Sequence, residues 1–219
     1  MKIKKTLDIS IDMAREWYNG SDEVLRKLAL EFYSVDELKV VSFEEIKTFE
    51  DAVNVLNLDI DDVYITINRL EKISKASAAI FKLNIIRKAL NLGQDLHLTK
   101  DPEDSYIYYP YNPFVTENSI YYEDELNSDK MEIIGTIKCE GEKYNILGGH
   151  AFGSGLAGLG YFDPNDGVGN AFATVGFLGC ANEEIAKHFG KYFGMLIIEA
   201  MYGRLDGFEV IEDKYGCLK

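Results

Sequence analysis

Residues 133–147 read Ile-Ile-Gly-Thr-Ile-Lys-Cys-Glu-Gly-Glu-Lys-Tyr-Asn-Ile-Leu, and this stretch decides the fold class. Two runs of strand-forming residues, 133–139 and 143–147, flank a short turn segment with glycine at its centre, a pattern typical of a β-hairpin. The run at 171–177, Ala-Phe-Ala-Thr-Val-Gly-Phe, predicts a third strand, and a further short strand is expected near 208–211.

The sequence around these strands is patterned for helices. Between residues 10 and 57, helix-start signals recur, and they predict a series of short helices; Ser34 and Ser42 begin full capping-box matches, and Thr48 begins a weaker one. Apolar residues at three- and four-residue spacing predict one helix over 59–92, about 45 Å long. A closing helix is predicted over 183–202, with Asn182 as its N-cap.

These elements predict an α+β fold. We expect N-terminal short helices and one long helix, packed with a small, mainly antiparallel sheet and a C-terminal helix. The expected organisation is a helical subdomain at 1–57 and an α+β domain at 58–219, with one shared core because no linker-like stretch separates them.

A glycine-rich block at 148–179 follows the hairpin. About a third of its residues are glycine, against about 7% in average proteins, yet many apolar residues lie among them. Glycine allows close approach of another backbone or a partner, so the block is interpreted as an ordered contact loop. The glycines proposed for an interface are Gly153, Gly155, Gly158 and Gly160.

An aromatic segment at 106–122 precedes the hairpin. Pro110 and Pro113 exclude a regular helix there and favour extended backbone. Its aromatic residues suit either a structural cover or the binding of a sugar or peptide. Those proposed for an interface are Tyr108, Tyr109 and Tyr111.

Composition narrows the class of partner. The formal net charge of −14 argues against nucleic acid as the main partner, because phosphates need a positive surface. Six basic residues between 69 and 88 and nine acidic residues between 101 and 132 indicate either solvated surfaces or electrostatic docking, within the chain or between copies.

Three widely spaced cysteines fit a reducing compartment. No secretory signal peptide and no bilayer-spanning run is recognised, so neither secretion by that route nor membrane insertion is expected.

Several motifs carry weak signals for chemistry. Gly153–Gly158 matches Gly-x-Gly-x-x-Gly, but the following Leu-Gly-Tyr-Phe-Asp-Pro does not open the helix that dinucleotide binding requires. Residues 163–169 suit a turn, and an irregular cation site stays open there. Cys180 precedes a predicted helix N-terminus, which favours a lowered thiol pKa, and His150 is the histidine that could approach it through the fold. We therefore expect no cofactor, no metal and no catalytic residue.

Two stretches resemble a known group of proteins. Residues 11–34, which begin Ile-Asp-Met-Ala-Arg-Glu-Trp, resemble a leading segment of uncharacterised proteins of gut Bacteroidetes and their phages, including crAss-like phages. Residues 158–162 and 176–193 resemble the closing portion of the same group, so that the likeness covers about half of the chain. No activity is assigned to the group, and the resemblance implies a phage or mobile-element setting without supplying catalytic residues.

The leading hypothesis is therefore a non-enzymatic structural or interaction protein of a phage particle. It would be a capsid-attached, fibre or tail component that assembles as a homo-oligomer with other virion proteins, in a virion assembled in the host cytoplasm. One alternative is an intracellular accessory protein that binds a host factor. Another is an enzyme with a site around Cys180, His150 and the glycine-rich block.

Overall fold

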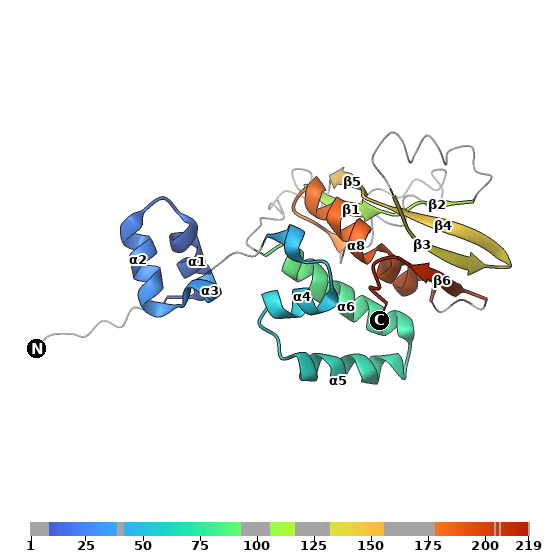
Figure 1. Ribbon diagram of the computed structural model, residues 1–219, viewed down its shortest axis with the longest axis horizontal. Coiled ribbons are helices and arrows are strands. Elements are labelled where there is room, and N and C mark those ends of the chain that lie inside the picture. Colours follow the sequence, from blue (N-terminus) through green and yellow to red (C-terminus); the bar gives the residue numbers. More distant parts are fainter. Residues whose placement is uncertain are drawn as a thin grey trace, which may run out of the picture. The chain divides into compact units, whose positions relative to one another are not determined.

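The structure is a computed structural model that describes residues 9–38, 42–92, 106–116, 132–155, 178–203, 205 and 207–218. It confirms the α+β class, since helices and small antiparallel sheets both contribute (Figure 1). The chain divides into two compact units, Met1–Ser42 and Phe43–Lys219.

The first unit contains three short helices whose buried residues form a cluster of their own. The helices begin where the sequence offers capping side chains: the Ser10 hydroxyl accepts a hydrogen bond from the Met13 N–H, and the Asp22 carboxylate accepts from Val24 and Leu25. Trp17 packs against the buried cluster, which is formed by Ile9, Ala14, Ala29 and Leu38. The helices are α1 (Ile11–Asn19), α2 (Glu23–Phe32) and α3 (Val35–Leu38).

The second unit begins earlier than the sequence suggested. A boundary after residue 57 places the helix that follows Thr48 in the N-terminal part, but Phe49, Ala52 and Val53 of this helix are buried in the core of the second unit. The capping box expected at Thr48 is present in full. The helical elements of this unit are η1 (Phe43–Glu45), α4 (Phe49–Val55), α5 (Ile60–Glu71), α6 (Lys75–Leu90) and α8 (Glu183–Tyr202).

The helix expected over 59–92 is two helices in the structure. Helix α5 ends at Glu71, Ser74 adopts an extended backbone (φ −166°, ψ 130°), and α6 then turns back along α5 (Figure 1). The reversal buries the apolar stripe of α5, including Val63 and Ile67, in the core that α6 also enters. Ile73, which the spacing placed on the apolar face, lies in the turn and is 79% exposed.

Within the described ranges, the strands form two antiparallel sheets. The predicted hairpin is confirmed as β3 (Glu132–Cys139) and β4 (Glu142–Gly148), joined through Glu140 and Gly141 with φ of 51° and 88°. With β2 (Phe114–Val115) and β6 (Glu209–Asp213), they form a sheet in the order β2-β4-β3-β6, and β1 (Tyr106–Tyr111) pairs separately with β5 (His150–Gly155).

Helix α8 organises the core of this unit. It contacts α6 and also β1, β5, β4 and β3 (Figure 1). Gly190 lets β1 come close, because a Cβ at this position would lie 2.9 Å from the Cβ of Pro110. The Asn112 amide nitrogen donates to the carbonyls of Leu147 and Gly190, both at 2.9 Å, and thus ties β4 to α8. The predicted closing helix is confirmed, with the Asn182 side chain accepting from the Ile185 N–H.

Candidate functional site

The predicted interface residues of β1 and β5 are neighbours across one ladder. The register places Tyr108 opposite Gly153, Tyr109 opposite Phe152 and Tyr111 opposite His150, although these residues are far apart in the sequence. Residues directly opposite each other share a face of the sheet, so Tyr108 has no side chain opposite it at Gly153. The structure therefore brings the aromatic segment and the start of the glycine-rich block together.

The other edge of β1 is bound to the segment that precedes α8. The Tyr108 N–H donates to the Cys180 carbonyl at 3.0 Å, and the Cys180 N–H donates to the Tyr108 carbonyl at 2.8 Å. The Asn91 side chain fixes the same segment, since its amide donates to the Gly179 carbonyl and its oxygen accepts from the Ala181 N–H. Strand β1 is consequently held between β5 and the entry to α8.

The three predicted tyrosines do not share a face. Tyr108 packs against the main core, and Pro110, two residues further along, approaches Gly190 of α8. Because side chains alternate along a strand, Tyr109 and Tyr111 lie on the opposite face, where both are half-buried. The ring of Tyr111 is 5.8 Å from that of His150, edge to face.

Other predicted features lie outside the described residues. These are Gly158 and Gly160 of the proposed interface, the turn at 163–169 and the strand expected at 171–177. Gly153 and Gly155 lie on β5.

The Cys180 thiol lies in an environment opposite to the one expected from its place near a helix start. Its side chain is fully buried, and its S–H donates to the Leu178 carbonyl at 3.4 Å. Burial raises the pKa of the thiol to about 12, despite the nearby positive charge of Arg87 and a hydrogen bond from Asn91. The expectation of a lowered pKa is therefore wrong, and a thiol in this state is a poor nucleophile.

His188 serves packing within the second unit. Its Nε2 lies 2.7 Å from the Ile46 carbonyl, to which it donates, and its ring contacts those of Phe43 and Tyr192 at 5.5 and 4.6 Å. Burial lowers the pKa of the imidazole, an effect that the hydrogen bond to Ile46 partly opposes. The neutral ring thus joins η1 to α8.

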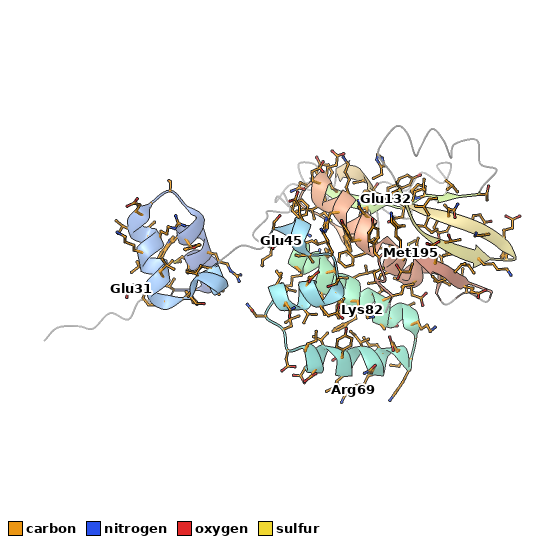
Figure 2. The ribbon with its side chains drawn as sticks, in the orientation of Figure 1. Glu31, Glu45, Arg69, Lys82, Glu132 and Met195 are labelled. Carbon is orange, nitrogen blue, oxygen red and sulfur yellow. The ribbon has the colours of Figure 1, made fainter. Side chains whose placement is uncertain are left out.

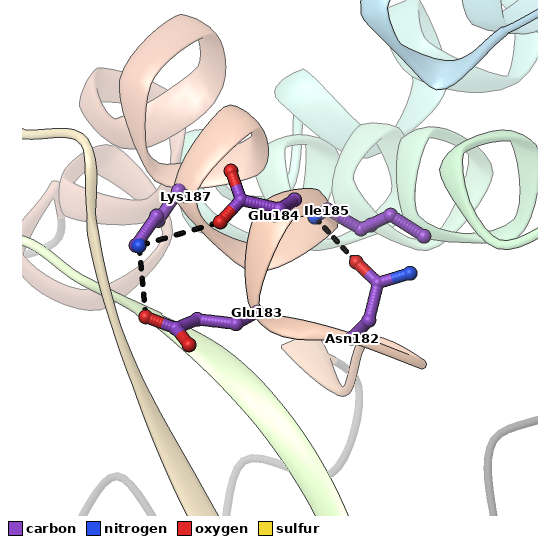
Figure 3. A network of polar contacts seen from close by, with 5 residues as sticks. All are labelled: Asn182, Glu183, Glu184, Ile185 and Lys187. Atoms are coloured by element: carbon purple, nitrogen blue, oxygen red, sulfur yellow. Dashed lines mark hydrogen bonds and ion pairs between the residues drawn. The ribbon is translucent and has the colours of Figure 1, made fainter.

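The carboxylates at the start of α8 are paired within the helix (Figure 3). The Lys187 ammonium lies 2.8 Å from Glu183 and 3.4 Å from Glu184, one helical turn away. The hydrogen bond from Lys187 lowers the pKa of Glu183. Both acids also stand in the first turn, where the helix dipole favours negative charge.

Glu132, at the start of β3, is the centre of a second polar cluster. Its carboxylate accepts from Lys191 at 2.6 Å, from the Tyr215 hydroxyl at 2.6 Å and from Lys214. Burial by itself would raise the pKa of Glu132, but these three hydrogen bonds together lower it to about 2. The cluster joins β3, α8 and the C-terminal segment.

The described residues also line an open cleft of about 1040 Å³. Its wall runs along α5 and α6, the C-terminal half of α8, and β6 with the segments beside it. The apolar lining consists of Ala78, Ala79, Leu196, Phe208, Val210 and Leu218. The polar lining consists of Asn68, Glu71, Lys72, Lys75, Lys82, Glu199 and Glu209.

Lys82 differs from the other charged residues of the cleft because it is buried, with 5% of its surface exposed. Figure 2 labels Lys82 on the second unit. Its ammonium lies 5.7 Å from the centre of the Phe49 ring. No ion pair between Lys82 and a carboxylate is found within the described ranges. Sequence reasoning placed Lys82 in the basic segment 69–88 without distinguishing it. The available signal was the helical row Lys75, Ala78, Ala79 and Lys82, whose small central residues leave room.

Within the described residues, no group of three or more His, Cys, Asp or Glu side chains is arranged to hold a metal ion. None of the helices in the described part of the chain combines the length and the apolar character needed to cross a membrane.

The fold and these surfaces define an α+β protein with a two-stranded tyrosine-bearing ladder and a separate cleft. Comparisons of the chain with models of protein families, with curated proteins and with solved structures find no match.

Proposed function

We propose that this protein is a non-enzymatic interaction protein of a phage particle that assembles with copies of itself through the β1–β5 ladder. The observation that carries the proposal is the presence of Tyr109 and Tyr111 on the ladder face that points away from α8. Tyrosine combines a large rigid contact area with a hydroxyl group and is enriched where interfaces derive most of their binding energy.

The geometry of β5 adds a backbone contribution. Within the described ranges β5 has one strand neighbour, β1. An edge strand offers N–H and carbonyl groups that can pair with a strand of another chain. Gly153 and Gly155 lie on this strand, and the absence of a Cβ at these positions would allow another backbone to approach closely.

The condition of the reactive groups also supports a non-enzymatic role. The buried Cys180 thiol has a raised pKa, and the Glu132 carboxylate is already held by Lys191, Lys214 and Tyr215. The phage setting rests on the resemblance of residues 11–34 and of the closing portion to proteins of gut Bacteroidetes and their phages. It makes the phage particle the assembly in which to look for this chain.

The oligomeric state in solution tests the interface. Sedimentation equilibrium should give a mass above that of one chain for the wild type, and the double substitution Tyr109→Ser/Tyr111→Ser should shift it to the monomer. Tyr144→Ser, on β4, is the matched control and should leave the mass unchanged. A monomeric wild type, or a double variant that assembles like the wild type, would contradict the proposed interface.

The virion setting needs a separate experiment. Mass spectrometry of purified particles should detect the chain at a reproducible copy number. Its consistent absence from particles, together with a host protein captured from infected cells, would favour the accessory-protein alternative instead.

A further inference from the structure

The cleft beside α6 combines features that the proposed interface does not use. Lys75, Ala78, Ala79 and Lys82 follow one another at helical spacing and therefore share one face of α6. Opposite this face stand Leu196 of α8 and Val210 of β6. A volume of about 1040 Å³ reaches the upper end of the range of about 300–1,000 Å³ that is usual for small-molecule sites.

Lys82 is buried along most of its length, and its ammonium is not among the fully buried polar atoms without a partner, so the charge reaches the cleft. Removing a charge from water is unfavourable unless an opposite charge or hydrogen bonds replace the lost hydration. The π face of Phe49, 5.7 Å away, replaces a part of it. The carboxylates that line the same cleft, Glu71, Glu199 and Glu209, form no ion pair with Lys82.

We propose that this cleft binds a small amphipathic anion: a single carboxylate or phosphate group meets Lys82, and an attached hydrocarbon part packs on the apolar wall. The anionic group supplies a negative charge to pair with the Lys82 ammonium, which has no carboxylate partner in the described part of the chain. The wall formed by Leu196, Phe208, Val210 and Leu218 provides the surface for the hydrocarbon.

The outer part of the cleft selects against other ligands. Glu71 and Glu209 are exposed there and face solvent together with Lys72 and Lys75, so the charges nearly balance. A polyanion such as a nucleic acid gains no net attraction from these balanced charges. A ligand with one anionic group places that group at the buried lysine and leaves the outer carboxylates in water.

Calorimetric titration of the full chain with decanoate and with decyl phosphate, both below micellar concentration, tests the proposal. We expect saturable binding of at least one of them at one site per chain. Decyltrimethylammonium has the same hydrocarbon chain with the opposite charge, and we expect it to bind at least about tenfold more weakly. Absence of saturable binding of both anions, or equal binding of the cation, would overturn the proposal.

Lys82→Met keeps an unbranched side chain that is one atom shorter and removes its charge, so it locates the binding group. It should weaken binding of the anion by about tenfold or more. Lys88→Met, at an exposed position of the same helix, is the matched control and should bind like the wild type. Lys82→Met binding as tightly as the wild type would show that the ammonium is not the binding group and overturn the assignment.

Two further experiments distinguish a free anion from a lipid surface as the ligand, and the cleft from the β1–β5 interface as the site. Vesicles of phosphatidylglycerol present the same chemistry as a lipid surface; binding to vesicles without binding of either single-chain anion would overturn the cleft as the site. The Tyr109→Ser/Tyr111→Ser variant should bind decanoate like the wild type, so failure of the proposed interface and failure of the cleft are distinguishable.

Discussion

Glu132 and Lys82 are two charged residues of the second unit whose side chains are mostly buried, and they differ in their polar partners. Glu132 has 28% of its side chain exposed and accepts hydrogen bonds from Lys191, Lys214 and Tyr215. Lys82 has 5% of its surface exposed and contacts the ring of Phe49. The more solvated charge has the larger number of polar partners.

The contrast separates a structural polar cluster from a candidate binding group. The three donors to Glu132 come from α8 and from the segment after β6, so their hydrogen bonds hold those parts to β3. Lys82 joins no such network in the described part of the chain, and the cleft gives a ligand access to it. Loss of Glu132 should therefore lower stability, whereas loss of the Lys82 charge should not.

The largest expected effect is that of Glu132→Gln. The amide keeps the shape of the side chain but offers no charge to the two lysines, and hydrogen bonds to charged groups contribute more than neutral ones. Because the lysines are partly solvated, we expect a loss of about 2 kcal/mol in the free energy of unfolding of the second unit. Urea unfolding followed by circular dichroism measures it, while the fluorescence of Trp17 follows the first unit separately.

Glu212→Gln is the control for this measurement. Glu212 is exposed on β6, and its substitution should change stability by less than about 0.5 kcal/mol. Should Glu132→Gln be as mild as the control, the Glu132 cluster would not hold the C-terminal segment to β3.

The second prediction concerns Lys82→Met and has the opposite sign. The substitution replaces a mostly buried charged side chain by an apolar one, keeps apolar contacts and loses a cation–π contact of about 0.5–1 kcal/mol. We expect a net gain of about 1 kcal/mol in the free energy of unfolding, measured without ligand. Lys88→Met should be neutral. A clear loss of stability in Lys82→Met would mean that the fold already compensates the ammonium, and the contrast with Glu132 would disappear.

The sequence predicted those elements whose signals are local. The turn of the hairpin needed two residues with positive φ, and Gly141 at its centre indicated this directly. The start of α8 was equally readable, because the Asn182 side chain accepts from the Ile185 N–H three residues later. The capping box at Thr48 located α4 for the same reason.

Features that depend on distant contacts were not predictable in this way. The apolar spacing runs through the turn at Ile73 and Ser74, so it gave no sign that α6 reverses along α5. Glu132 belonged to an acidic run, but Lys214, a partner 82 residues away, meets it only through the pairing of β3 with β6. The sequence showed Lys82 only as one lysine of a basic segment. Its burial could not be predicted, because burial on both sides of α6 depends on α5 and α8 together.

The candidate interface has features that local sequence predicted and features that depend on distant contacts. Proline and aromatic composition correctly indicated extended backbone at 106–111, and the assignment of Gly153 and Gly155 to an interface stays a prediction. The separation of Tyr108 from Tyr109 and Tyr111 follows from strand alternation and from the side on which α8 packs. The sequence contains the alternation but not the position of α8.

The smallest expected effect is a pH dependence that belongs to Glu132 alone. Its carboxyl pKa is lowered from 4.5 to about 2 in the folded chain, so the folded state favours the charged form. The stability that it contributes is complete above the unfolded pKa and is lost as pH falls through the window from 4.5 towards 2. Because the site is partly solvated, we expect the wild type to lose less than about 1 kcal/mol more than Glu132→Gln between pH 6 and pH 3.5. Denaturant unfolding of both proteins at the two pH values measures this difference.

Lys82→Met should follow the wild-type curve, since its contacts contain no titrating carboxylate partner among the described residues. Parallel curves for the wild type and Glu132→Gln would mean that Glu132 does not favour its charged form on folding, and that the two buried charges differ less than their surroundings indicate.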